Sequence, residues 1–114
     1  MSQLDFEKLD VYVCAIELLR FSTEVLDRLP RGESELRSQL RRAAMSIPLN
    51  IAEGTGKPSA PDRARFHAVA RGSAMECGAI LQVCGIMGYL PSAEEQRGRE
   101  LVLRIVSMLT RMCR

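Results

Sequence analysis

Few side chains in this sequence are of the types that carry out acid–base or covalent chemistry. His67 is the only histidine, and a lone histidine is more often a surface or capping residue than a general base. Ser46 and Ser73 have no histidine or lysine nearby in the sequence that would activate their hydroxyls. The stretch GTGKPS, residues 54–59, resembles a phosphate-binding loop, but it lacks the spacing of that motif and a preceding strand. The sequence therefore predicts a protein that is not an enzyme, with no catalytic residue, no cofactor and no small-molecule substrate.

The four cysteines do not have the spacing of a metal site. Cys14, Cys77 and Cys84 lie in apolar helical contexts, and Cys113 follows near the end of the chain, so no C-x-x-C pair is present. Such cysteines usually act as small apolar side chains in a core. No apolar run reaches the roughly 20 residues needed to cross a bilayer, and the chain does not open with a secretory signal pattern. We therefore expect reduced thiols, no bound metal, no membrane contact and a cytoplasmic location.

Arginine is the other side chain with recognisable chemistry, because a guanidinium can hold a phosphate through two parallel hydrogen bonds. Residues 1–35 carry four bases and eight acids, a net charge of −4, whereas residues 36–75 carry seven bases and two acids, a net charge of +5. The basic stretch predicts a salt-sensitive, sequence-independent contact with RNA or DNA. A solvated basic surface, or pairing with the acidic first helix of another subunit, would explain the same charges. The candidate nucleic-acid-binding residues are Arg37, Arg41, Arg63, Arg65 and Arg71, of which Arg63 and Arg65 are expected to be exposed.

Helical periodicity and helix-breaking residues divide the chain into four segments. We expect helices over about residues 9–29, 34–54, 59–87 and from 92 to near the end. Ser34 is a suitable N-cap for the second helix, and Ser92 with Glu95 forms a capping box for the fourth. No segment alternates with a period of two, and the connections are short. The sequence predicts an all-α fold, with residues 1–114 forming a single antiparallel, up-down-up-down four-helix bundle.

Apolar side chains spaced three and four residues apart predict the buried face of each helix. The chain has no tryptophan and few other aromatic residues, so the predicted core is aliphatic. The expected buried faces are Leu9, Tyr12, Ile16, Leu19, Thr23 and Leu26 in the first helix; Leu36, Leu40, Ala44, Ile47 and Ile51 in the second; Phe66, Ala70, Ser73, Cys77, Ile80, Cys84 and Met87 in the third; and Leu101, Ile105, Met108 and Met112 in the fourth.

Pro48 lies inside the pattern of the second helix and predicts a disturbance there. It has no N–H to donate to the Ala44 carbonyl, and its ring crowds that carbonyl. The helix either kinks and continues, or ends and restarts with Ser46 as a new N-cap. The apolar stripe keeps its phase through the proline, which favours a continuous, kinked helix. We expect Ser46 to bond back to the Arg42 carbonyl and Asn50 to reach carbonyls freed by the proline.

The same stretch carries a family resemblance. Residues 39–57, QLRRAAMSIPLNIAEGTGK, resemble the signature of the four-helix-bundle proteins encoded in intervening sequences of bacterial 23S ribosomal RNA genes. FEKLDVY, RFHAVARGSAMECGAIL and GYL agree elsewhere, so the resemblance covers nearly the whole chain. In the third helix Ser73 and Glu76 match the family, but the following Cys77 and Gly78 depart from it, which weakens a polar role for that pair. The structural motif of the resemblance comprises Arg42, Ser46, Pro48, Asn50, Glu53 and Gly54, expected to form a polar, kinked region together with Arg41.

The resemblance also implies how the protein assembles and what it contacts. Family members are antiparallel bundles, and some form closed five-fold rings. A related accessory protein of diversity-generating retroelements forms a pentamer and works with a reverse transcriptase and nucleic acid. We therefore expect a homo-oligomer, with a pentamer favoured, that interacts with RNA or DNA as a scaffold. The alternative is a purely structural oligomer or protein-interaction module without nucleic-acid binding. The apolar surface expected to meet another subunit comprises Met45, Leu49, Val102 and Leu109.

Overall fold

The computed structural model of the chain describes residues 3–114, in which all regular structure is helical. A short 3-10 helix, η1, is followed by four α-helices, and no strand occurs among the described residues. The predicted all-α class and four helices are confirmed. The elements are η1 (Asp5–Lys8), α1 (Asp10–Arg28), α2 (Ser34–Thr55), α3 (Ala60–Ile86) and α4 (Ser92–Met112).

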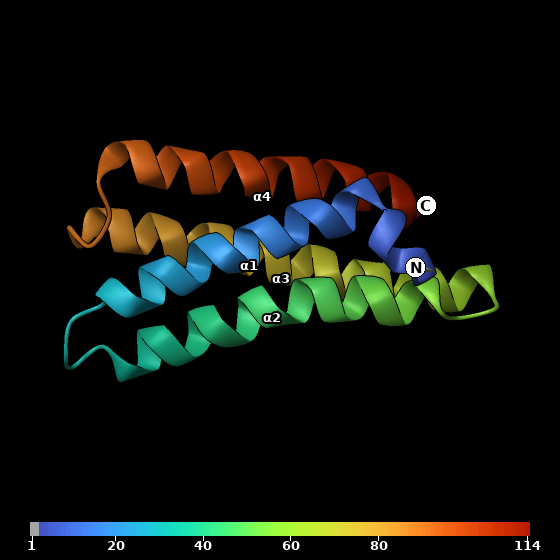
Figure 1. Ribbon diagram of the computed structural model, residues 1–114, viewed down its shortest axis with the longest axis horizontal. Coiled ribbons are helices and arrows are strands. Elements are labelled where there is room, and N and C mark those ends of the chain that lie inside the picture. The colour runs from blue at the N-terminus through green and yellow to red at the C-terminus, as the bar shows by residue number, and fades with distance from the viewer. Residues whose placement is uncertain (1–2) are drawn as a thin grey trace.

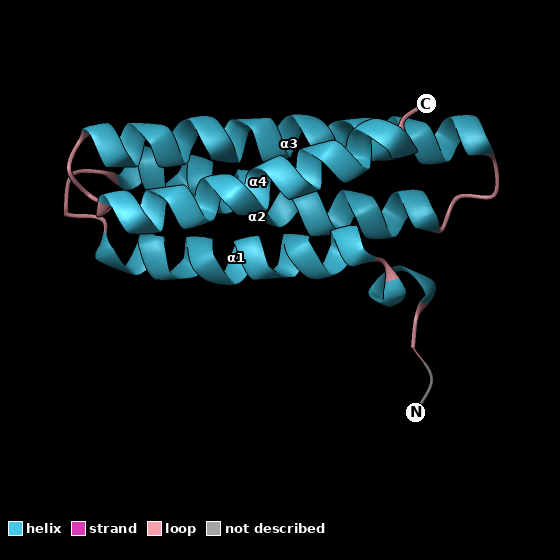
Figure 2. Cartoon of the chain, turned by 90° about the horizontal axis from the view of Figure 1, so that it is seen from above, coloured by secondary structure: helices cyan, strands magenta, loops and turns pink. Residues whose placement is uncertain are grey.

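The four helices pack around one core, each against two neighbours. α1 contacts α2 and α4, and α3 contacts the same two helices, with the most extensive packing between α2 and α3. Figure 1 shows the α1–α2 and α3–α4 connections at one end of the bundle and the α2–α3 connection at the other. Consecutive helices therefore lie side by side, as in an up-down-up-down bundle. In Figure 2, α1 and α3 lie along opposite long edges, with α2 and α4 between them.

Local chemistry explains where the helices begin and turn. The Ser59 hydroxyl accepts a hydrogen bond from the Asp62 backbone N–H at 3.2 Å and caps α3, with Pro61 in the first turn. Gly32 and Gly88 adopt φ values of +95° and +82° in the α1–α2 and α3–α4 connections. Glycine suits both positions because side chains with a Cβ disfavour this region. Among the described residues, no helix is both long and apolar enough to span a membrane.

Two predicted caps are wrong. Ser34 is already the first residue of α2, and the N-cap is Glu33, whose side chain accepts from the Tyr89 hydroxyl instead. The capping box at Ser92 and Glu95 does not form, because α4 begins at Ser92 and its N-cap is Pro91. The Glu95 carboxylate turns towards Gly85 of α3, where it occupies the space that a Cβ would need.

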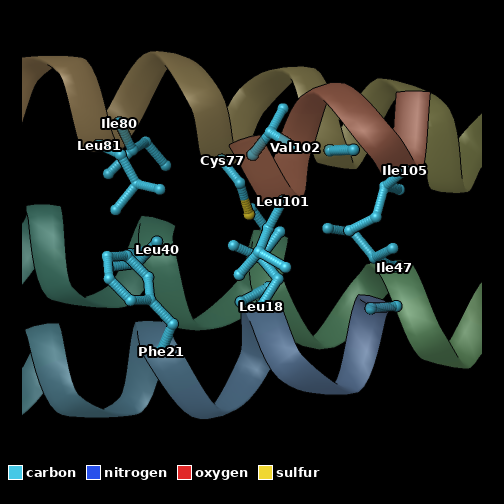
Figure 3. Packing of buried hydrophobic residues seen from close by; sticks show 14 of the residues in the cluster. Leu18, Phe21, Leu40, Ile47, Cys77, Ile80, Leu81, Leu101, Val102 and Ile105 are labelled. Atoms are coloured by element: carbon cyan, nitrogen blue, oxygen red, sulfur yellow. The ribbon is translucent and has the colours of Figure 1, made fainter. Parts of the chain in front are cut away.

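The core is aliphatic, as predicted, and side chains from all four helices meet between the ribbons in Figure 3. The predicted face of α2 holds, with Leu36 partly buried. The predicted face of α3 holds at Ala70, Cys77, Ile80 and Cys84, but Phe66 and Ser73 are only partly buried and Met87 is half-exposed. The predicted face of α1 is only partly correct, because that helix is apolar on two adjoining sides. Leu9, Tyr12, Leu19 and Leu26 pack against the core but stay partly exposed, and the adjoining side is the fully buried one. The buried residues of α1 are Val11, Cys14, Ala15, Leu18, Phe21, Ser22 and Val25.

The expected extra apolar surface is only partly present. Met45 and Leu49 are exposed on α2, as predicted. Val102 and Leu109 are buried in the core, so the prediction that they widen the outer surface of α4 is wrong. α2 is one helix through the buried Pro48, which favours continuation over restart; the kink itself stays a prediction.

Candidate functional site

Polar side chains join α2 to α3 along one edge of their contact, and we call this set the polar edge: Arg42, Ser46, Asn50, Ser73 and Glu76. The Arg42 guanidinium pairs with the Glu76 carboxylate at 2.6 Å. The Ser73 hydroxyl donates to the Ser46 hydroxyl at 2.8 Å. The Asn50 amide donates to the Ser46 hydroxyl at 3.0 Å and to the Ser46 carbonyl at 2.8 Å. The Ser46 hydroxyl is therefore the centre of a network that crosses between the helices.

The spacing of the recognisable motif explains this edge. Arg42, Ser46, Asn50 and Gly54 are each four residues apart, and such residues share one side of a helix. At Gly54 the helices approach so closely that a Cβ would lie 2.8 Å from Cδ2 of His67 and 3.0 Å from Cβ of Phe66. Glycine is needed at this position because of the close contact. It does not end the helix, since α2 continues to Thr55, one residue beyond the predicted end.

Three sequence expectations about this region need correction. The polar role of Ser73 and Glu76 is not weakened by the following Cys77 and Gly78, since both side chains bind α2. The Ser46 hydroxyl bonds to the side chains of Asn50 and Ser73 and not to the Arg42 carbonyl. The Asn50 amide reaches the Ser46 carbonyl, not the Ala44 carbonyl that Pro48 leaves without its usual donor.

His67 is buried where α3 packs against the end of α2, and only 5 % of it is exposed. Neither ring nitrogen makes a well-aligned hydrogen bond among the described residues, although the Ile51 carbonyl lies close enough to interact with the ring. Burial lowers the pKa of His67, an effect that the Ile51 carbonyl opposes and the Arg63 charge reinforces. The side chain is therefore kept neutral and is packed away from the surface, so it has no access to a substrate.

The outward side of α2 forms a shallow, arginine-lined groove of about 750 Å³, which we call the basic face. It runs from Ser34 to Asn50, about 24 Å along the helix axis. No acidic side chain lines it, and Met45 and Leu49 give it an apolar floor. Its lining residues are Ser34, Arg37, Ser38, Arg41, Arg42, Met45, Ser46, Leu49 and Asn50.

Two of the five candidate nucleic-acid-binding arginines, Arg37 and Arg41, lie together on the basic face. The half-buried Arg37 donates to the Leu29 carbonyl at 2.9 Å, which fixes the start of α2 against the end of α1. Arg41 is exposed and has no ion pair or side-chain hydrogen bond within residues 3–114. Arg41 is therefore the candidate most available to a phosphate.

The other three candidates lie elsewhere. Arg63 donates to the carbonyls of Lys57 and Pro58 at 3.0 and 2.8 Å, so it ties down the α2–α3 connection and is not the exposed residue that the sequence suggested. Arg65 is exposed and pairs with Asp62 at 3.3 Å. Arg71 donates to the Thr110 hydroxyl and joins α3 to α4. The five arginines do not form one surface.

The remaining motif residues have local roles. Pro48 is buried, and Glu53 forms a long ion pair with Lys57 at 3.9 Å.

Within residues 3–114 no cluster of histidine, cysteine or carboxylate side chains could hold a metal ion. Burial raises the pKa of the Cys77 thiol to about 12, with Glu76 adding to the effect and Arg42 opposing it. That thiol is a protonated core side chain and not a ligand or nucleophile.

Comparisons with known proteins agree on the fold. A family model described as 23S rRNA-intervening sequence protein matches residues 7–111. Among solved structures, a protein of unknown function from the S23 ribosomal protein family of Bacteroides thetaiotaomicron is similar, with a TM-score of 0.83 and 19 % sequence identity over 91 % of this chain and 98 % of that chain. At that identity the likeness establishes the shared fold alone. A comparison with curated proteins gave no match.

Proposed function

This chain belongs to the 23S rRNA-intervening sequence protein family, and from that premise we propose that it is a non-enzymatic, cytoplasmic homo-oligomer that binds RNA or DNA. It acts as a scaffold or accessory in a ribonucleoprotein, and a closed ring of five is the assembly that the resemblance favours. The contact is made with the sugar–phosphate backbone and is independent of base sequence.

The basic face carries this proposal. Three arginines and four other polar side chains line about 24 Å of one helix, and no acidic residue is among the lining side chains, although Glu76 of α3 pairs with Arg42 beside the groove. That arrangement suits an extended polyanion better than a compact ligand, because the groove is long and lined by a single helix. The face has no aromatic side chain on which a base could stack. Repetition of the face in an oligomer would turn weak contacts into useful affinity.

The test is the affinity for a labelled 30-nucleotide RNA and for a DNA duplex, measured by fluorescence anisotropy at 50 and 200 mM salt. Three phosphate contacts per chain predict a loss of affinity for single-stranded RNA of about 20-fold over that range. Arg41→Glu removes the one arginine of the basic face that has no partner within residues 3–114, and it should weaken binding at least 10-fold. Arg99→Glu, an exposed residue of α4 outside the basic face, makes the same charge change and serves as the control.

The proposal fails if the wild-type protein ignores RNA and DNA at 50 mM salt, or if Arg99→Glu weakens binding as much as Arg41→Glu. One observation favours the alternative of a purely structural module. Arg37, Arg42, Arg63 and Arg71 each bind a group of the same chain, so most of these arginines already stabilise the fold. An oligomer that binds no nucleic acid would establish that alternative.

A further inference from the structure

The outward side of α3 carries an uncharged apolar line along most of the helix. Six exposed residues, three or four positions apart, run over about 27 Å and form what we call the α3 ridge: Ala68, Gly72, Met75, Ala79, Val83 and Ile86. Ile86 is 80 % exposed and Met75 53 %. Between Gly72 and Ser92 the sequence has a single charged residue, Glu76, and Arg42 pairs with it at the polar edge.

α3 is thus apolar on two opposite sides. One side builds the core through Ala70, Ala74, Cys77, Leu81 and Cys84, and the other faces solvent. A helix that is apolar all round is normally buried on all sides. The α3 ridge also lacks the charges that polar surface helices carry, and charge depletion is typical of the centre of a protein interface. Its chemistry excludes a phosphate backbone as the occupant, because nothing on it attracts an anion.

The same chain offers a concave counterpart. Between α1 and α4 lies a groove of about 470 Å³, the α1–α4 groove, with Val13 and Leu103 as exposed apolar side chains, 49 % and 54 % exposed. Asp10 and Glu17 lie on its α1 side, and Arg104 and Arg111 lie on its α4 side. The groove therefore combines apolar side chains with two acidic and two basic ones, whose charges balance.

We infer that the α3 ridge of one copy docks in the α1–α4 groove of a second copy. An exposed helix is convex and fits a groove between two helices better than it fits another ridge. The ridge brings no charge of its own, and the four groove charges are exposed and balanced in sign, so docking adds no unpaired ion to the interface. α1 and α3 lie along opposite edges of the bundle (Figure 2), so each copy can dock on one neighbour and receive another. Such a contact is head-to-tail.

This inference deepens the homo-oligomer part of the proposed function and rests on it. It leaves the basic face of α2 uncovered, since α2 contributes to neither surface. Assembly and nucleic-acid binding would therefore use separate parts of the same chain.

The test uses two double variants that each block one surface. Met75→Glu with Val83→Glu places charges on the ridge, and Val13→Glu with Leu103→Glu places them in the groove. Gln39→Glu with Gln96→Glu, at exposed positions outside both surfaces, adds the same charge as a control. Molar mass is measured by light scattering at 50 µM, and helicity by circular dichroism shows that each variant folds.

We expect an oligomeric wild type and control, and a single-chain mass for each blocked variant alone. An equal mixture of the two blocked variants retains one intact ridge and one intact groove, so it should give a two-chain species. A groove variant that still assembles, or a mixture that stays single-chain, would overturn the docking. In those cases an oligomeric wild type keeps the homo-oligomer proposal. A single-chain wild type would contradict both the docking and the homo-oligomer proposal. The affinity for RNA is measured separately and tests only the proposed nucleic-acid binding.

Discussion

Acidification should destabilise this bundle through His67 well before its carboxylates titrate. The imidazole is buried against Gly54 and Phe66, and neither ring nitrogen makes a well-aligned hydrogen bond within the described residues. Protonation would place a cation in this site, near the Arg63 charge. Because the pKa of His67 is lowered in the folded state, the unfolded chain takes up the proton first. Stability is therefore unaffected above about pH 7 and falls as the pH drops through the unfolded-state pKa.

The magnitude follows from the linkage. An unfolded-state histidine has a pKa of about 6.5, so at pH 5.5 it is about nine-tenths protonated. Each pH unit by which the folded-state pKa lies below the unfolded-state value lowers the free energy of unfolding at acidic pH by about 1.4 kcal/mol. Below the unfolded pKa the loss grows by up to about 1.4 kcal/mol per pH unit until the folded imidazole also titrates.

Urea unfolding of the wild type and of His67→Leu at pH 7.5 and 5.5 measures this loss. The leucine variant removes the titrating group and a buried polar side chain without a well-aligned hydrogen bond, so it should lose less stability on acidification. Because His67 is the only histidine, the NMR titration of its ring protons gives the folded-state pKa directly. An equal loss in both proteins, or a ring pKa at or above 6.5, would refute the reasoning.

Three further predictions concern the packing and burial of individual side chains. A Cβ at Gly98 would lie 2.7 Å from Cε2 of Phe21 and 2.9 Å from Cδ1 of Leu81, so Gly98→Ala should lower the free energy of unfolding by about 1–2 kcal/mol despite its better helix propensity. Gly72→Ala, which meets nothing within 4 Å, should raise it by up to about 1 kcal/mol in the same urea titration. Thiol labelling at pH 8 should modify the partly exposed Cys113 rapidly and Cys77 only after unfolding, because burial raises the pKa of the Cys77 thiol to about 12.

The sequence predicted the helices more accurately than it predicted which side of each helix faces the core. The buried stripe of α2 was correct because Leu40, Ala44, Ile47 and Ile51 keep a spacing of three and four residues through Pro48, which marks one side of the helix. The face predicted for α1 lies at the edge of the core and not at its centre, because apolar residues cover two adjoining sides of that helix. Tertiary packing decides between two such faces: one entered the core, and on the other Tyr12 lies against Phe6 of η1, with ring centres 4.8 Å apart.

The predictions of the helix caps and of the arginine surface were wrong for a related reason. The pattern at Ser92 and Glu95 satisfies a local rule, yet Glu95 lies against α3, a contact that local sequence does not encode. Charge counting likewise found the basic stretch but could not tell that Arg63 and Arg71 bind groups within the chain. The polar edge, in contrast, was detectable. Its residues on α2 recur every four positions, and that spacing alone places them on one side of a helix.

The two adjacent arginines of the QLRR stretch show how structure and function divide in this motif. Arg42 is in step with Ser46, Asn50 and Gly54, so it faces α3 and pairs with Glu76. Arg41, one residue earlier, is turned by about 100° around the helix and meets solvent on the basic face. Most of the recognisable motif is accounted for by helix packing, since it joins α2 to α3. Under the proposed function, Arg41 is the arginine of the basic face best placed to contact a phosphate, because no group within residues 3–114 pairs with its charge.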